Sequence, residues 1–113
     1  MQIENTKAQL RKGVLELCVL SILSVERKYS SEMISHLKDA KLIIVEGTLY
    51  PLLTRLRSAG FLSYEWEESK NGPPRKYYSI TDEGKHFLSE LYSSWNELQL
   101  AVEQLTNPNK ELL

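Results

Sequence analysis

Polar and cationic side chains that could bind a ligand are concentrated in two short stretches of this chain. The first, residues 46–59, has hydroxyls and a guanidinium on the side opposite its leucines, and no acid after its first residue. Such groups bond phosphates and base edges in the major groove of DNA. The candidates for base or groove contacts are Thr48, Tyr50, Thr54 and Arg55.

The second stretch, residues 70–76, is rich in turn residues and cations. Cations on a projecting loop reach the phosphates beside a groove, and their contribution weakens with salt. The candidates for phosphate contacts are Lys70, Arg75 and Lys76. An ordinary polar helix face and a solvated turn with incidental lysines are the alternatives that each stretch leaves open by itself.

Other kinds of site have no motif in the sequence. His36 and His86 lie far apart, each without a cysteine or an acidic cluster at metal-ligand spacing, so we expect no metal site. We find no glycine-rich phosphate loop, nucleophile elbow or pair of carboxylates. We therefore expect neither an enzyme nor a bound cofactor.

Length and composition fit one small domain. The chain has 113 residues, of which 42% are hydrophobic, and its formal net charge is −1. That charge is unevenly distributed, because residues 82–105 hold five acids and one base. This acidic segment masks the basic stretch at 70–76 in the net charge, although a ligand that meets the stretch would encounter its local positive charge. No apolar run approaches the ~20 residues that span a bilayer. The single cysteine, Cys18, fits a reducing compartment, so we expect a cytoplasmic protein without a membrane segment.

The elements that must position these residues follow from periodicity and caps. We expect a long helix over residues 6–25, a second helix that Ser30 or Ser31 caps and that ends near Lys41, and a third helix over 46–59. Gly60 suits the position after the third helix, and Pro51 belongs in its first turn or two. The run at residues 42–45 favours a short strand that pairs elsewhere.

The second half of the chain predicts a hairpin and a final helix. Residues 61–66 and 76–80 are strand candidates, and residues 67–75 form a long tip between them. Thr81 caps a helix that runs to about Leu105, where Asn107 and Pro108 stop it. Three helices followed by a hairpin are typical of a winged helix-turn-helix. We expect a mainly α chain with a small β-hairpin, in which residues 1–81 bind DNA and residues 82–113 form a dimerisation helix and tail.

A heptad row marks the final helix, because six apolar residues recur at spacings of three and four. The row consists of Leu88, Leu91, Trp95, Leu98, Val102 and Leu105. Either the first helix of the same chain or a partner subunit covers it, and we favour the partner. A two-fold homodimer matches a palindromic operator with half-sites about one helical turn apart.

Two segments of the chain resemble the signature stretches of the PadR family of bacterial transcription regulators. They are residues 46–56 (EGTLYPLLTRL) and 72–84 (GPPRKYYSITDEG), and residues 29–34 (YSSEMI) resemble the family's opening of the second helix. The chain is similar to the short branch with a single C-terminal helix. The resemblance implies a winged-helix dimer whose third helix and wing contact operator DNA. It also implies a repressor of its own promoter or of a neighbouring efflux or detoxification gene.

The resemblance also suggests an effector site. In multidrug-sensing members of the short branch, a tryptophan at the place of Trp95 stacks on planar aromatic ligands at the dimer centre. Here Val14, Leu91 and Leu98 would line the site with it. The plainer alternative is a tryptophan that only fills the interface. The rival function from another class is a protein-interaction module, which would show no salt-dependent DNA affinity beyond the non-specific range.

Overall fold

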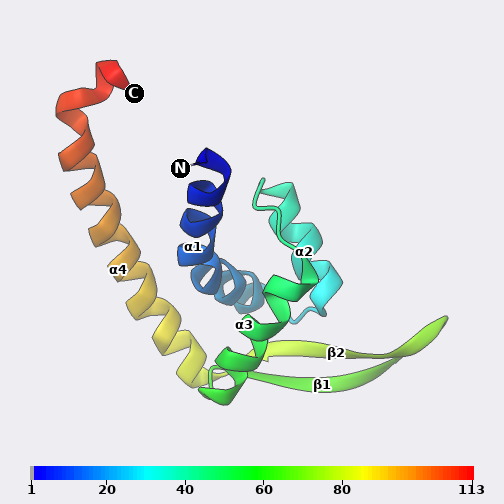
Figure 1. Ribbon diagram of the computed structural model, residues 1–113. Helices are drawn as coiled ribbons and strands as arrows, with labels where there is room; N and C mark the ends of the chain where they lie inside the picture. Colours follow the sequence, from blue (N-terminus) through cyan, green and yellow to red (C-terminus); the bar gives the residue numbers. More distant parts are fainter. Residues whose placement is uncertain (1) are drawn as a thin grey trace.

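The computed structural model describes residues 2–113 and is mainly helical, with one two-stranded antiparallel hairpin (Figure 1). Three helices precede the hairpin and a long one follows it, which confirms the winged helix-turn-helix predicted from the sequence. The elements are α1 (Ile3–Val25), α2 (Ser30–Asp39), α3 (Glu46–Ser58), β1 (Leu62–Ser69), β2 (Gly72–Ile80), α4 (Asp82–Thr106) and the 3₁₀ helix η1 (Asn107–Leu112).

The core lies where α1, α2 and α3 meet the base of the hairpin. The predicted leucine stripe of α3 is buried in full, since Leu49, Leu52, Leu53 and Leu56 are at most 4% exposed. It packs against Leu20 of α1 and against Met33 and Leu37 of α2, all within one cluster of buried side chains. Because the leucines of α3 face inward, its polar side faces outward. Gly60 adopts φ +87° directly after α3, the left-handed conformation expected of a glycine at a helix end.

The strand predicted for residues 42–45 is absent, and that prediction was wrong. Lys41 takes φ 69°, and Leu42 donates its N–H to the carbonyl of Leu37 over 2.9 Å, so these residues close the end of α2. At Tyr78 the outer edge of β2 is paired with Lys28 instead. The backbones of Lys28 and Tyr78 exchange hydrogen bonds of 3.2 and 2.9 Å. An edge group that is already paired accepts no second strand.

The hairpin is longer, and its turn tighter, than the sequence predicted. Both strands continue through the residues assigned to a long tip, and only Lys70 and Asn71 form the turn. The pairing follows Trp66↔Lys76 and Glu67↔Arg75, and then shifts register before Ser69↔Gly72. Prolines are tolerated on edge strands and at bulges because they have no N–H to donate. Pro73 and Pro74 therefore sit in the irregular part of β2 without ending it.

The β1–β2 hairpin is the wing of the winged helix, and the start of α4 is fixed to its base. The hydroxyl of Thr81 accepts from the Gly84 N–H over 3.0 Å, which confirms the predicted N-cap, and donates to the Gly60 carbonyl over 2.7 Å. Phe87 stacks on Phe61 with ring centroids 4.2 Å apart. A Cβ added to Gly84 would come within 2.2 Å of the Phe61 carbonyl oxygen, so this close approach requires glycine.

Beyond its first turns α4 leaves the body of the molecule, on the side away from the hairpin (Figure 1). The chain is correspondingly elongated, with extents of 55 × 31 × 21 Å. Its radius of gyration is 16.4 Å, whereas a compact chain of this length has about 13 Å. None of the described helices combines the length and the apolarity needed to cross a membrane.

Candidate nucleic-acid interface

The outward side of α3 presents the hydroxyls singled out from the sequence. Tyr50 and Thr54 are exposed, and Thr48 is half-buried. Tyr50 lies toward the start of α2, where its hydroxyl shares a hydrogen bond of 3.0 Å with the hydroxyl of Ser30. These groups stand on a rigid, well-packed helix, as base-reading side chains must.

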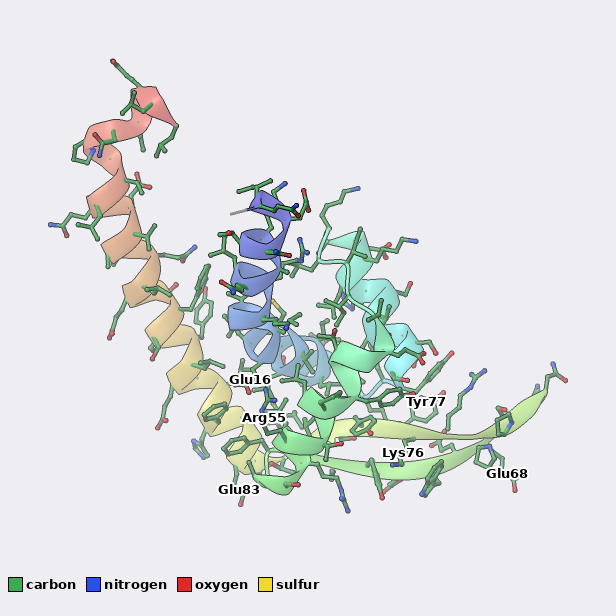
Figure 2. The ribbon with its side chains drawn as sticks, viewed as in Figure 1. Glu16, Arg55, Glu68, Lys76, Tyr77 and Glu83 are labelled. Carbon is green, nitrogen blue, oxygen red and sulfur yellow. The ribbon has the colours of Figure 1, made fainter. Side chains whose placement is uncertain are left out.

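Arg55 is not simply exposed to solvent. Its Nη2 donates to Oε1 of Glu16 in α1 over 3.0 Å, and the two side chains point toward each other between the helices (Figure 2). The Arg55 side chain is 64% exposed, while Glu16 is 34% exposed. One edge of the guanidinium is therefore held by α1 and the rest remains available.

The face of the wing that carries Lys76 is built from alternating cations and rings. Lys76 Nζ lies 4.5 Å from the centre of the Tyr64 ring and 5.2 Å from that of Trp66. Arg57, in the last turn of α3, lies 4.6 Å from the same Tyr64 ring. A cation over an aromatic face is attracted by the ring quadrupole. The rings therefore hold both cations at the junction of α3 and the wing, and Trp66 is itself 61% exposed.

A second set of rings holds Arg75. Its guanidinium lies 4.5 Å from the centre of the Tyr29 ring, and Tyr29 meets Tyr77 edge-on at 5.3 Å. Arg27 lies 4.7 Å from the Tyr77 ring and forms an ion pair with Glu67 of β1. The connector between α1 and α2 is thus tied to the wing by side chains as well as by the Lys28–Tyr78 backbone bonds. The direction of the hairpin is fixed at its base.

The tip of the wing is free of such restraints. Lys70 occupies the turn and is exposed. The hairpin projects from the body with Lys76 and Tyr77 along its length and Glu68 near its end (Figure 2). The neighbouring residues Tyr77 and Tyr78 of β2 differ in their surroundings. Tyr78 is buried in the core, and burial raises the pKa of its hydroxyl. Tyr77 packs against Tyr29 and Arg27 as described above.

Between α2, α3 and the wing lies a cavity of about 370 Å³. Tyr50, Trp66, Arg75 and Lys76 are among its lining residues. The structure thus brings one predicted residue of α3 together with two of the three wing cations. Thr48 and Arg55 lie on the other flank of α3, toward α1. The residues predicted on α3 are therefore not all on the side of the wing.

The apolar row of α4 is divided along its length. Leu88 and Leu91 pack against the core of their own chain, and Trp95 is half-buried. Leu98, Val102 and Leu105 are 50–76% exposed. The alternative of packing on the same chain therefore holds for the first part of the row only.

A cavity of about 720 Å³ opens beside that exposed part. Leu10 of α1 and Trp95, Leu98 and Val102 of α4 are among its lining residues. Of the four residues predicted for an effector site, Trp95 and Leu98 line this cavity, whereas Val14 and Leu91 do not. Its size is within the range of small-molecule sites.

Within residues 2–113 no group of histidine, cysteine and acidic side chains is arranged to hold a metal ion. Cys18 is partly buried among apolar neighbours, and burial raises the pKa of its thiol. A thiol in that state is a poor nucleophile.

Sequence reasoning missed four residues that shape this surface. Glu16, Arg27, Tyr29 and Arg57 each contact a side chain singled out from the sequence or the ring beside it. The spacing of these residues along the chain carries no signal, because their partners lie in other elements.

Comparison with known proteins points in the same direction as this geometry. A model of the PadR-like family of transcriptional regulators matches residues 19–90. This stretch runs from within α1 to within α4 and includes both the outward face of α3 and the wing.

Solved structures extend the similarity over most of the chain. A PadR-like transcription factor from Bacteroides fragilis is 55% identical, with a TM-score of 0.75, and the match covers 89% of this chain and 98% of that one. A PadR family transcriptional regulator from Eggerthella lenta is 39% identical with a TM-score of 0.84, over 91% and 90% of the two chains. A PadR-like regulator from Bacillus cereus is also 39% identical, with a TM-score of 0.75, over 86% and 95%.

Proposed function

This chain belongs to the PadR-like family of transcriptional regulators, and from that premise we propose that it represses transcription as a homodimer on a palindromic operator. As a member it is a DNA-binding transcription regulator. The proposal adds the residues, the assembly, the sign of regulation and its control. The regulated gene would be its own or a neighbouring efflux or detoxification gene.

One observation carries the DNA-binding part of the proposal: two of the three wing cations are pre-positioned. Lys76 and Arg75 are each held over aromatic rings along a projecting hairpin. Long side chains normally lose rotamer freedom on binding, which costs free energy, and a side chain already held loses less. Lys70, Arg75 and Lys76 contact phosphates in this proposal, and Thr48, Tyr50, Thr54 and Arg55 contact the groove.

The two parts of the chain have separate roles. Residues 1–81 bind DNA, and residues 82–113 provide the dimer contact and tail. Leu98, Val102 and Leu105 are exposed on a helix that leaves the body, and a soluble protein covers such a stripe with a partner. A second copy, related by a two-fold axis, covers it here and places two wings on two half-sites.

Control by a small molecule uses the cavity beside Trp95. A planar aromatic ligand stacks on that indole between α1 and α4 and shifts the spacing of the two wings. Because the ligand must bind one spacing better than the other, it changes operator affinity by that difference.

The DNA-binding part is tested by selecting bound fragments from random duplexes and titrating the selected sequence in a mobility-shift assay at several salt concentrations. We expect a palindromic consensus and an affinity that falls steeply with salt. Affinity confined to the weak, sequence-independent range would point to the protein-interaction module instead.

The effector part is tested by tryptophan fluorescence with a panel of planar cationic and phenolic compounds. We expect quenching that is lost in Trp95→Ala and kept in Trp66→Ala, since Trp66 lies in the wing. No quenching across the panel would mean a dimer without an effector of this kind.

A further inference from the structure

A groove of about 330 Å³ lies between α1 and the outward side of α3. Lys12 of α1 and Gly47, Thr48 and Arg55 of α3 are among its lining residues. The groove lies on the flank of α3 opposite to the wing. It therefore borders the face that meets DNA in the proposed function, and yet one of its walls belongs to a helix with no assigned DNA contact.

The charges of this groove leave Lys12 unneutralised. Arg55 is paired with Glu16, the only acid of α1 near the groove, over 3.0 Å. Lys12 stands one turn before Glu16, is exposed, and makes no ion pair or hydrogen bond with any part of the chain that the structure describes. The three side chains together carry one positive charge, which favours an anionic ligand.

Gly47 has no role in the fold that explains it. A Cβ added to it would meet nothing within 4 Å, and its backbone does not have a positive φ. Glycine is unfavourable in a helix relative to alanine because it loses more conformational freedom. What glycine does permit is close approach of another molecule's backbone. The empty space beside Gly47 opens on the same groove as Lys12.

We propose that this groove seats the sugar–phosphate backbone of one operator strand, with Lys12 neutralising a phosphate and Gly47 providing the room. The inference rests on the proposed function and extends its footprint from α3 and the wing to α1. The contact is with the backbone, so it contributes equally on every DNA sequence.

The phosphate contact of Lys12 is tested by measuring the affinity of Lys12→Ala for the selected operator and for a random duplex, across a salt series. We expect both affinities to fall by about five- to tenfold and the salt slope to drop by about one. Lys7→Ala is the matched control, because Lys7 lies on the same helix, pairs with Glu4 and does not line the groove. It should bind both duplexes as wild type does.

The role of Gly47 in leaving room for the DNA backbone is tested with Gly47→Ala, which is measured by thermal unfolding and by the same titrations. We expect a Tm equal to or above that of the wild type together with a loss of DNA affinity. Wild-type affinity and salt slope in both Lys12→Ala and Gly47→Ala would overturn the groove contact. If Arg75→Ala and Lys76→Ala weaken binding in that same series, only the groove contact is overturned. If these two variants also bind as the wild type does, the proposed function is overturned with it.

Discussion

Arg55 in α3 and Glu16 in α1 are joined by a hydrogen bond of 3.0 Å between Nη2 and Oε1. The pair connects the helix that presents the candidate base contacts to the helix that borders the cavity beside Trp95. Since both partners are partly exposed, the pair adds at most about 1 kcal/mol to stability. Its consequence is therefore the orientation of the guanidinium.

Glu16→Ala should lower the discrimination between operator and random DNA. Without its acceptor Arg55 is no longer held in one orientation, and the surface gains one positive charge. We expect affinity for random duplexes to rise several-fold while the preference for the operator shrinks, with the free energy of unfolding changed by less than about 1 kcal/mol. Mobility-shift titrations on both duplexes measure this. Glu90→Ala removes the same charge from exposed α4 and should leave the ratio unchanged; an equal effect there would show that charge alone is responsible.

Arg75→Ala and Lys76→Ala should each weaken binding to every DNA sequence. Each removes one cation that is held over an aromatic ring, so the slope of log affinity against log salt should fall by about 0.9. Titrations at four or more salt concentrations give that slope. Thr54→Ala, by contrast, should alter sequence preference with little change in slope. Unchanged binding in both wing variants would contradict the phosphate assignment.

Leu98→Glu should abolish self-association and leave the winged helix folded. Leu98 is 56% exposed in the single chain, so a carboxylate there costs the monomer little, whereas it would be buried in the proposed dimer. Sedimentation equilibrium measures the oligomeric state, and circular dichroism measures the fold. Ser93→Glu places the same charge on an exposed position of α4 on the side opposite the apolar row and should remain dimeric. A dimeric Leu98→Glu would place the interface elsewhere.

Gly84→Ala should be destabilising, although Gly84 lies in a helix where alanine is normally preferred. Its Cβ would lie 2.2 Å from a backbone oxygen of Phe61 and 2.7 Å from Ile80, and overpacking of this kind costs about 1–3 kcal/mol or more. Gly13→Ala is the control, because nothing lies within 4 Å of its Cβ, and it should stabilise α1 by about 0.5–1 kcal/mol. Urea unfolding of the two variants tests the pair. A Gly84→Ala protein as stable as the wild type would mean that α4 can move away from Phe61.

What the sequence determined is local. The spacing of four leucines turned the polar side of α3 outward, Gly60 ended that helix with a positive φ, and the Thr81 hydroxyl capped α4. Each of these features depends on residues a few positions apart, and at that separation helix geometry itself determines which residues are neighbours. The cations of residues 70–76 were also visible, because a cluster within one short stretch needs no knowledge of the rest of the chain.

Tertiary structure alone decided the partners across elements. Residues 42–45 close the end of α2 and form no strand, and the bridge to Tyr78 of β2 is made by Lys28. The length of the hairpin depended on strand pairing that continued past Pro73 and Pro74. Arg55 and Glu16 are 39 positions apart, and Arg75 and Tyr29 also belong to different elements. The physical reason is common to all four: such contacts follow from how helices and strands pack on one core, and intrinsic preferences of single residues carry no record of that packing.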